Sequence, residues 1–127
     1  MKIRIIDTFS ELGVLHVSFQ SPVGSGTALW SDSVPKAGEI VDMEFDLDEV
    51  FSWGKNMTHS SEKTPKISAI ANVTYITAEL SQGADEKCAV LKISDSIILI
   101  ELDGPIPQES GFVEVRAARI HLYPTNI

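Results

Sequence analysis

The sequence predicts an all-β protein, built either as a small antiparallel barrel or as a two-layer sandwich. β-branched and aromatic residues gather in short runs, and Gly, Pro, Ser and Asp separate the runs. No window of about 11 residues has the three- and four-residue apolar spacing of an amphipathic helix. Roughly six to eight strands of ordinary length fit this pattern, which is the number that a closed barrel or a two-layer sandwich needs.

The length of 127 residues favours one domain. A domain of this size buries about two-thirds of the surface that its unfolded chain exposes, so it needs no disulfide or structural metal. The apolar fraction of 43% and the charged fraction of 22% are ordinary for a globular protein. We therefore expect a single β domain over residues 1–127.

The N-terminal residues and the cysteine content indicate a cytoplasmic protein. Asp7 comes too early for the apolar region of a signal peptide, and Cys88 is the only cysteine. The longest apolar run is Ile97–Ile100, far short of the ~20 residues of a membrane span. We expect no membrane association, and Cys88 is expected to be a small core residue.

The first third of the chain contains three expected strands. Lys2–Phe9 and Val14–Phe19 form the first two, with Gly13 as either a hairpin turn or a bulge in one long strand. The Gly- and Pro-containing segment 21–26 is expected to be a loop, and Thr27–Trp30 a short edge strand.

The clearest alternation in the chain runs from Ile40 to Asp48. One face carries apolar side chains, namely Val41, Met43, Phe45 and Leu47, and the other carries Asp42, Glu44, Asp46 and Asp48. A period of two is typical of a half-buried antiparallel strand. We therefore expect an extended segment with one buried face and one anionic face.

Residues 51–65 lack any period and are expected to form a long loop, of the kind that is often functional or mobile. Residues 66–80 read as one long strand whose apolar parity switches midway, which indicates a bulge or a coiled strand. Cys88–Ile93 and Ile97–Leu102 read as a hairpin closed at Ser94, Asp95 and Ser96, and Phe112–Tyr123 reads as a final long strand.

Long strands, a large central loop and a long final strand together resemble the layout of the oligonucleotide/oligosaccharide-binding (OB) barrel. The resemblance is one of layout and includes no diagnostic sequence motif. It implies an OB-like barrel as one form of the predicted fold and leaves the function open.

The net charge of −8 argues against nucleic acid and anionic membranes as partners, because phosphate binding needs a basic surface. The row formed by Asp42, Glu44, Asp46 and Asp48 is either a docking face for a basic protein or a solvated surface. A calcium site is disfavoured, because a straight strand fans its carboxylates outward instead of converging them. Arg116 or Arg119, on the expected final strand, could pair with this row.

Trp53 is the second candidate for partner binding, because a tryptophan in a long loop can bury a large area against another protein. The alternative is that its ring folds back over one end of the barrel. Lys55 and His59 follow in the same loop, and an aromatic ring among basic groups could stack a nucleobase. Trp53, Lys55 and His59 therefore form an alternative ligand site.

No pattern in the sequence indicates catalysis, a cofactor or a metal. His16, His59 and His121 have no second ligand at zinc spacing, and no nucleophile elbow, phosphate loop or dinucleotide fingerprint occurs. The sequence therefore favours a non-enzymatic binding module whose acidic face engages a basic protein partner, by analogy with immunity proteins and antitoxins. The alternative is an OB-like barrel that binds single-stranded nucleic acid or a saccharide through the Trp53 loop. The oligomeric state stays open.

Overall fold

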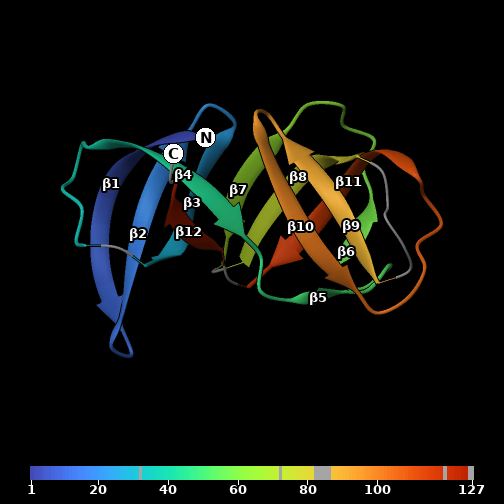
Figure 1. Ribbon diagram of the computed structural model, residues 1–127, viewed down its shortest axis with the longest axis horizontal. Coiled ribbons are helices and arrows are strands. Elements are labelled where there is room, and N and C mark those ends of the chain that lie inside the picture. Colours follow the sequence, from blue (N-terminus) through green and yellow to red (C-terminus); the bar gives the residue numbers. More distant parts are fainter. Residues whose placement is uncertain (32, 72, 82–86, 119, 126–127) are drawn as a thin grey trace.

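Strands and the turns between them make up the chain, and no helix occurs among the residues described (Figure 1). The computed structural model describes residues 1–31, 33–71, 73–81, 87–118 and 120–125. The described residues thus include no helix that could cross a membrane. The strands are β1 (Lys2–Glu11), β2 (Val14–Ser21), β3 (Gly24–Trp30), β4 (Ile40–Asp46), β5 (Val50–Phe51), β6 (Met57–His59), β7 (Lys66–Ile70), β8 (Val73–Ser81), β9 (Cys88–Ile93), β10 (Ser96–Leu102), β11 (Ser110–Ala117) and β12 (His121–Pro124).

Five of these strands close into a barrel, in the cyclic order β1, β2, β3, β12, β4. All neighbours are antiparallel except β3 and β12, which are parallel. The prediction of an all-β fold with a small barrel is therefore confirmed, and the barrel is mixed instead of purely antiparallel.

Alternating apolar residues fill the barrel and explain why these segments form strands. Inward-facing side chains on β1, β2 and β4 include Ile3, Phe19 and Phe45, all of which are buried. The rings of Phe19 and Phe45 pack with their centroids 5.9 Å apart. Burying such side chains stabilises the fold by about 1.5–3 kcal/mol each. The intervening polar residues therefore face outward.

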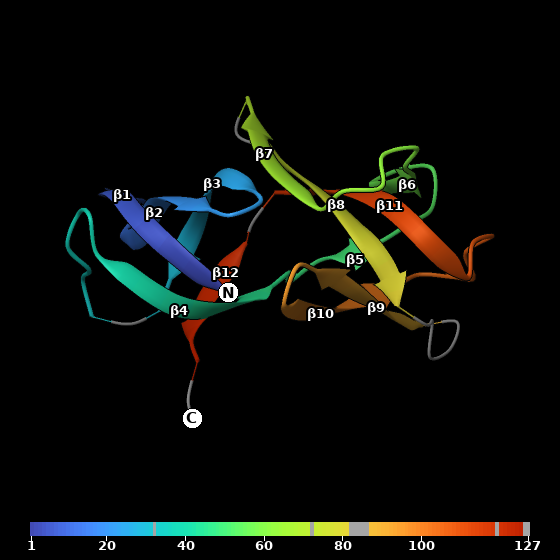
Figure 2. The same ribbon diagram turned by 90° about the horizontal axis from the view of Figure 1, so that it is seen from above.

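A second group of strands, β5 to β11, is inserted between β4 and β12 and lies beside the barrel (Figures 1 and 2). Its sheet runs from β7 through β8, β9 and β10 to β5, and β11 pairs with both β8 and β6. The buried residues of the barrel and of this inserted part form one contiguous apolar cluster.

A hydrogen bond joins the two segments that connect the inserted part to the barrel, one before β5 and one after β11. Ala118, just after β11, donates its N–H to Oε2 of Glu49, just before β5, at 2.9 Å. A second junction lies between β3 and β7, where Ile67 donates its N–H to the carbonyl of Val23 at 2.9 Å. Gly24 packs against the backbone of Ile67 so closely that a Cβ atom would overlap the Ile67 carbonyl group.

The first hairpin settles the role of Gly13. Leu12 and Gly13 form a two-residue turn between β1 and β2, with φ angles of 53° and 76°. Positive φ at both central residues is typical of the type I′ turn, whose twist matches paired strands. The irregularity in β1 lies instead between Ile5 and Asp7.

Two predicted long strands are each divided in the structure. The segment 66–80 forms the hairpin of β7 and β8, so the prediction of a single strand was wrong. The apolar positions change face because the chain turns near Ala71, which has a φ of 51°. The segment 112–123 was also wrongly predicted as one strand. It contains most of β11, which belongs to the inserted part, and most of β12, which belongs to the barrel.

Two further expectations need correction. Segment 21–26 is mostly strand around a tight turn, and β3 is no edge strand, because it pairs with β2, β7 and β12. Segment 51–65 is more regular than expected, since it includes part of β5 and all of β6. The β9–β10 hairpin was predicted correctly, although its turn is tighter, with Ser96 paired directly to Ile93.

Candidate functional site: an acidic strand beside an apolar face

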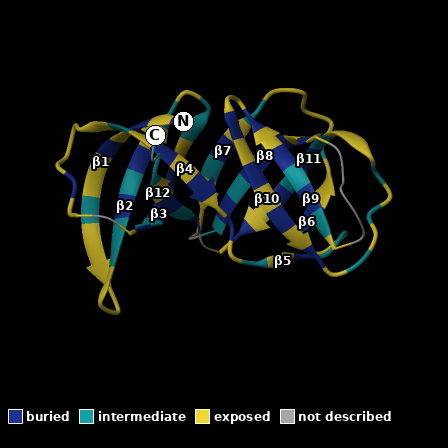
Figure 3. Cartoon of the chain, in the orientation of Figure 1, coloured by how far each residue is buried: buried dark blue, intermediate teal, exposed yellow. Residues whose placement is uncertain are grey.

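The acidic row lies along β4 and its C-terminal extension, as the alternation predicted. Asp42, Glu44, Asp46 and Asp48 are exposed, whereas Met43, Phe45 and Leu47 are buried between them. Figure 3 shows the resulting alternation of buried and exposed residues along β4. Side chains on one face of a strand are spaced by about 6.5–7 Å, so the carboxylates form a linear anionic track.

The two ends of this row differ in their neighbours. Asp42 accepts a hydrogen bond from the N-terminal ammonium group of Met1 at 3.1 Å and lies opposite Lys2 on β1. Asp46 lies opposite His121 on β12. Glu44, Asp46 and Asp48 have no hydrogen-bond or ion-pair partner within the described part of the chain.

The predicted arginine partner of the row is not found at Arg116. That residue is on β11 and lies opposite Tyr75 of β8, in the inserted part of the fold. Arg119 lies outside the described residues. The Met1 amino group is the one cation that forms an ion pair with the row among the residues described.

A surface hollow of about 440 Å³ lies where the acidic row meets β5 and β10. Four carboxylates and no cation line it, together with apolar and sulfur-containing side chains: Asp46, Leu47, Asp48, Glu49, Val50, Cys88, Leu99, Ile100 and Glu101. Glu49 is partly engaged, because it accepts the hydrogen bond from Ala118. The remaining three carboxylates have no partner within the described chain.

Large apolar side chains are exposed within and beside this hollow. Leu99 is 67% exposed and Val50 is 50% exposed, and Ile97, two residues before Leu99 on the same face of β10, is 66% exposed. Val90 on β9 is half-buried and lies directly opposite Leu99. These four residues, Val50, Val90, Ile97 and Leu99, are called the apolar face below.

The apolar face was not predicted from the sequence. The signal was present, because the run Ile97–Ile100 is apolar at consecutive positions, which face opposite sides of a strand, and a strand that buries only one face does not require this. The side chains of Ile98, Ile100 and Leu102 are buried in the core. Those of Ile97 and Leu99 lie at the alternate positions of β10 and are therefore exposed to solvent.

Trp53 does not line the acidic hollow. It is half-buried in the turn after β5, where its ring packs against the apolar core, and its backbone pairs with Met57. Lys55 is exposed in the same turn, and His59 is exposed at the end of β6, where its Nδ1 lies 3.0 Å from Oε1 of Gln108. The structure therefore does not bring Trp53 to the surface where the carboxylates and the apolar face meet.

Asn56 holds the Trp53 turn in place. Its Oδ1 accepts a hydrogen bond from the N–H of Ser52 at 2.7 Å, and its Nδ2 donates to the carbonyl of Val50 at 3.1 Å. Its own carbonyl accepts the N–H of Arg116 at 2.9 Å. The segment that looked structureless in the sequence is therefore tied to both β5 and β11.

Two further observations bear on the site. Cys88 is half-buried and lines the hollow, so the prediction that it is a core residue was wrong. Among the described residues, no group of three or more His, Cys, Asp or Glu side chains is arranged to hold a metal ion.

Comparison with known proteins adds no relative. No protein-family model, curated protein or solved structure matches the chain at a significant level.

Proposed function

We propose that this protein is a non-enzymatic binding module that docks a basic protein through the acidic row and the apolar face. The observation that carries the proposal is the hollow in which exposed Leu99 and Val50 lie among four carboxylates and no cation. We further propose that the partner presents an apolar side chain flanked by lysines or arginines.

The two chemistries of this surface would serve different steps of binding. A row of like charges on a partner-facing strand speeds encounter with a basic surface and fixes its orientation. The apolar face would supply the desolvated centre, since interface energy is concentrated in a few well-packed apolar and aromatic residues with a polar rim.

Solubility alone accounts for the carboxylates but not for the apolar face. Large apolar residues exposed singly are common, whereas neighbouring ones rimmed by polar groups are typical of interaction sites. Ile97 and Leu99 are neighbours on one face of β10, and Val90 and Val50 flank Leu99. The combination therefore favours docking over a plain solvated surface.

An anionic docking face fits an immunity protein or antitoxin, in which the inhibitor would occupy the basic surface that its target uses for nucleic acid. This assignment is by analogy with the size and acidity of such inhibitors. It requires the partner to be basic over the area that contacts β4.

The alternative, a nucleic-acid or saccharide site at Trp53, has less support. The Trp53 ring packs against the core, and its turn belongs to the inserted part and not to the barrel.

The cyclic strand order of the barrel, with its single parallel pair, is consistent with the proposal of an OB-like layout.

Capture of partners from a lysate of the native host tests the proposal. Wild-type protein is compared with Asp46→Asn/Asp48→Asn and with the control Glu62→Gln/Glu109→Gln, which removes equal charge from exposed sites elsewhere. We expect a basic protein that the wild type and the control capture and the Asp46/Asp48 variant loses. Capture of an acidic protein, or equal capture by all three, would contradict the proposal.

A further inference from the structure

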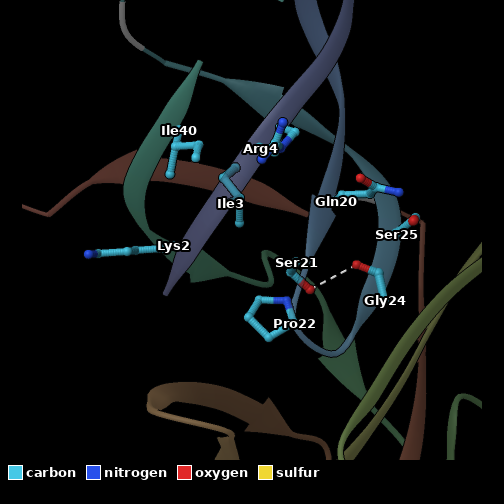
Figure 4. Close-up of a pocket in the computed structure, with 9 residues that line it drawn as sticks. All are labelled: Lys2, Ile3, Arg4, Gln20, Ser21, Pro22, Gly24, Ser25 and Ile40. Atoms are coloured by element: carbon cyan, nitrogen blue, oxygen red, sulfur yellow. Dashed lines mark hydrogen bonds between the residues drawn. The ribbon is translucent and has the colours of Figure 1, made fainter. Parts of the chain in front are cut away.

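A row of donor groups crosses the outer face of the barrel, at the opposite end of β1 from the first hairpin. Arg4 on β1 lies opposite Gln20 on β2, and Gln20 lies opposite Ser25 on β3. All three residues are exposed. Figure 4 shows their side chains on three neighbouring strands, with Lys2 on the same strand as Arg4 and directed to the other side of β1 from Gln20 and Ser25.

This hollow has the opposite charge to the acidic one. Its volume is about 400 Å³, and it is lined by Lys2, Ile3, Arg4, Gln20, Ser21, Pro22, Gly24, Ser25 and Ile40. It therefore holds two cations and no carboxylate, in a protein whose net charge is −8.

The donors of the hollow are free to bind a ligand. The side chains of Lys2, Arg4, Gln20 and Ser25 make no hydrogen bond or ion pair with the described residues. Ser21 is engaged instead in the turn, where its hydroxyl donates to the carbonyl of Gly24 at 2.8 Å (Figure 4). A guanidinium fork, an ammonium, an amide and a hydroxyl together match an oxyanion with several acceptor oxygens.

We propose that this hollow binds the phosphate group of a small phosphorylated molecule. Arg4 would donate two parallel hydrogen bonds to the phosphate, Gln20 and Ser25 would contact its remaining oxygens, and Lys2 would add a second positive charge at the edge of the hollow. This hollow shares no lining residue with the acidic hollow at β4 and β10.

The flanking charges favour a single phosphate over a nucleic-acid chain. Asp42 lies opposite Lys2 on one side of the hollow, and Asp7 follows Arg4 along β1. The sugar-phosphate backbone of a nucleic acid that continued from the hollow along β1 or toward β4 would meet one of these carboxylates. One phosphate on Arg4 avoids both.

Apolar groups around the donors would accommodate the organic part of the ligand. Ile40, at the start of β4, lies opposite Arg4 at one end of the donor row, and Pro22 lies at the turn between β2 and β3; both line the hollow (Figure 4). A hollow of this size and mixed lining is in the range that small ligands use, which is about 300–1,000 Å³.

Titration of the protein with ribose 5-phosphate tests this inference, with ribose and an octathymidylate lacking terminal phosphates as comparison ligands. Binding is followed by the amide chemical shifts of residues 2–4, 20–25 and 40, and by calorimetry. The variant Arg4→Gln is compared with Arg116→Gln, which makes the same charge change at an exposed arginine of the inserted part. Arg4→Lys keeps the positive charge and removes the paired donors of the guanidinium group. Gln20→Ala removes the amide donor from the hollow.

We expect ribose 5-phosphate to bind saturably and ribose not to bind. Arg4→Gln should weaken binding by about tenfold or more, as expected for loss of hydrogen bonds to a charged group, and Arg4→Lys should have an intermediate effect. Arg116→Gln should stay within about twofold of wild type. Absence of saturable binding, equal losses in Arg4→Gln and Arg116→Gln, or tighter binding of the octathymidylate than of ribose 5-phosphate would overturn the inference.

Discussion

The ammonium nitrogen of Met1 lies 3.1 Å from Oδ1 of Asp42, and this contact divides the acidic strand into two halves. The same ammonium also donates to the carbonyl of Met43 at 2.9 Å, so it is held in place by β4 itself. Asp42 is 48% exposed, yet its charge is locally compensated. The uncompensated charge is thereby concentrated on Glu44, Asp46 and Asp48, toward the apolar face.

This division predicts that the two ends of the acidic row contribute unequally to the association rate. Asp42→Asn should change the association rate with a captured basic partner by less than about twofold, whereas Asp46→Asn/Asp48→Asn should slow it roughly fivefold or more, because uncompensated rim charges act mainly on encounter. Surface plasmon resonance of the purified partner measures both. Equal effects at Asp42 and at the Asp46/Asp48 pair would show that local compensation does not matter.

The apolar face should act on dissociation. Leu99→Ser should raise the dissociation rate about tenfold or more, because a desolvated apolar contact at the centre of an interface is lost. Its effect on the free energy of unfolding should stay within about 0.5 kcal/mol, since the side chain is exposed. Leu12→Ser is the control, because Leu12 is 98% exposed at the tip of the first hairpin and does not line the acidic hollow. An unchanged dissociation rate in Leu99→Ser, or a similar rise in Leu12→Ser, would count against the apolar face.

Gly24 should be intolerant of any side chain. Its φ of 138° is strained for other residues, and an added Cβ would overlap the backbone of Ile67 at the junction of β3 and β7. Gly24→Ala should lower the free energy of unfolding by about 2–4 kcal/mol, measured by urea denaturation. Gly104→Ala, where an added Cβ meets nothing within 4 Å, should change it by less than about 1 kcal/mol. A Gly24→Ala protein as stable as wild type would show that the two parts of the fold do not depend on this close approach.

Glu49 should stabilise the point where the inserted part leaves and rejoins the barrel. Glu49→Ala removes the acceptor for the N–H of Ala118 and should cost about 1–2 kcal/mol of unfolding free energy. Glu49→Gln retains an acceptor oxygen and should lie within about 0.5 kcal/mol of wild type. Because Glu49 also lines the acidic hollow, the glutamine variant separates the loss of charge from the loss of the hydrogen bond. If the two variants are equally destabilised in urea, charge and not the hydrogen bond is responsible.

Local pattern predicted the strands whose two faces differ. The alternation over Ile40–Asp48 identified β4 and its acidic face, because each inward position is apolar and each outward one is charged. The β9–β10 hairpin was found in the same way, from two apolar runs around a polar turn.

Turns without a strong sequence signal were harder to predict. Ala71 adopts a positive φ although alanine rarely does so, and the hairpin between β7 and β8 was therefore read as one strand. Likewise, nothing in residues 118–120 marks a break between β11 and β12, since the division depends on which part of the fold each strand joins.

The candidate site depended on contacts between segments far apart in the chain. Leu99 and Glu101 reach the acidic row only because the β9–β10 hairpin lies beside the end of β4, and no local pattern encodes that placement. The residue type of Trp53 and its place in a long segment without a period predicted a binding residue, yet its ring packs against the core. The carboxylates of the site were predictable from the sequence, and its apolar component was not.

The dependence of the association rate on ionic strength tests the central claim most directly. Stopped-flow mixing of the captured partner with wild-type protein and with Asp46→Asn/Asp48→Asn is carried out between about 0.01 M and 0.15 M salt, over which the screening length falls from ~30 Å to ~8 Å. The account predicts that the wild-type association rate falls several-fold over this range and that the variant shows a markedly shallower dependence. An association rate that does not change with salt, or one with the same slope in both proteins, would contradict docking through the acidic strand.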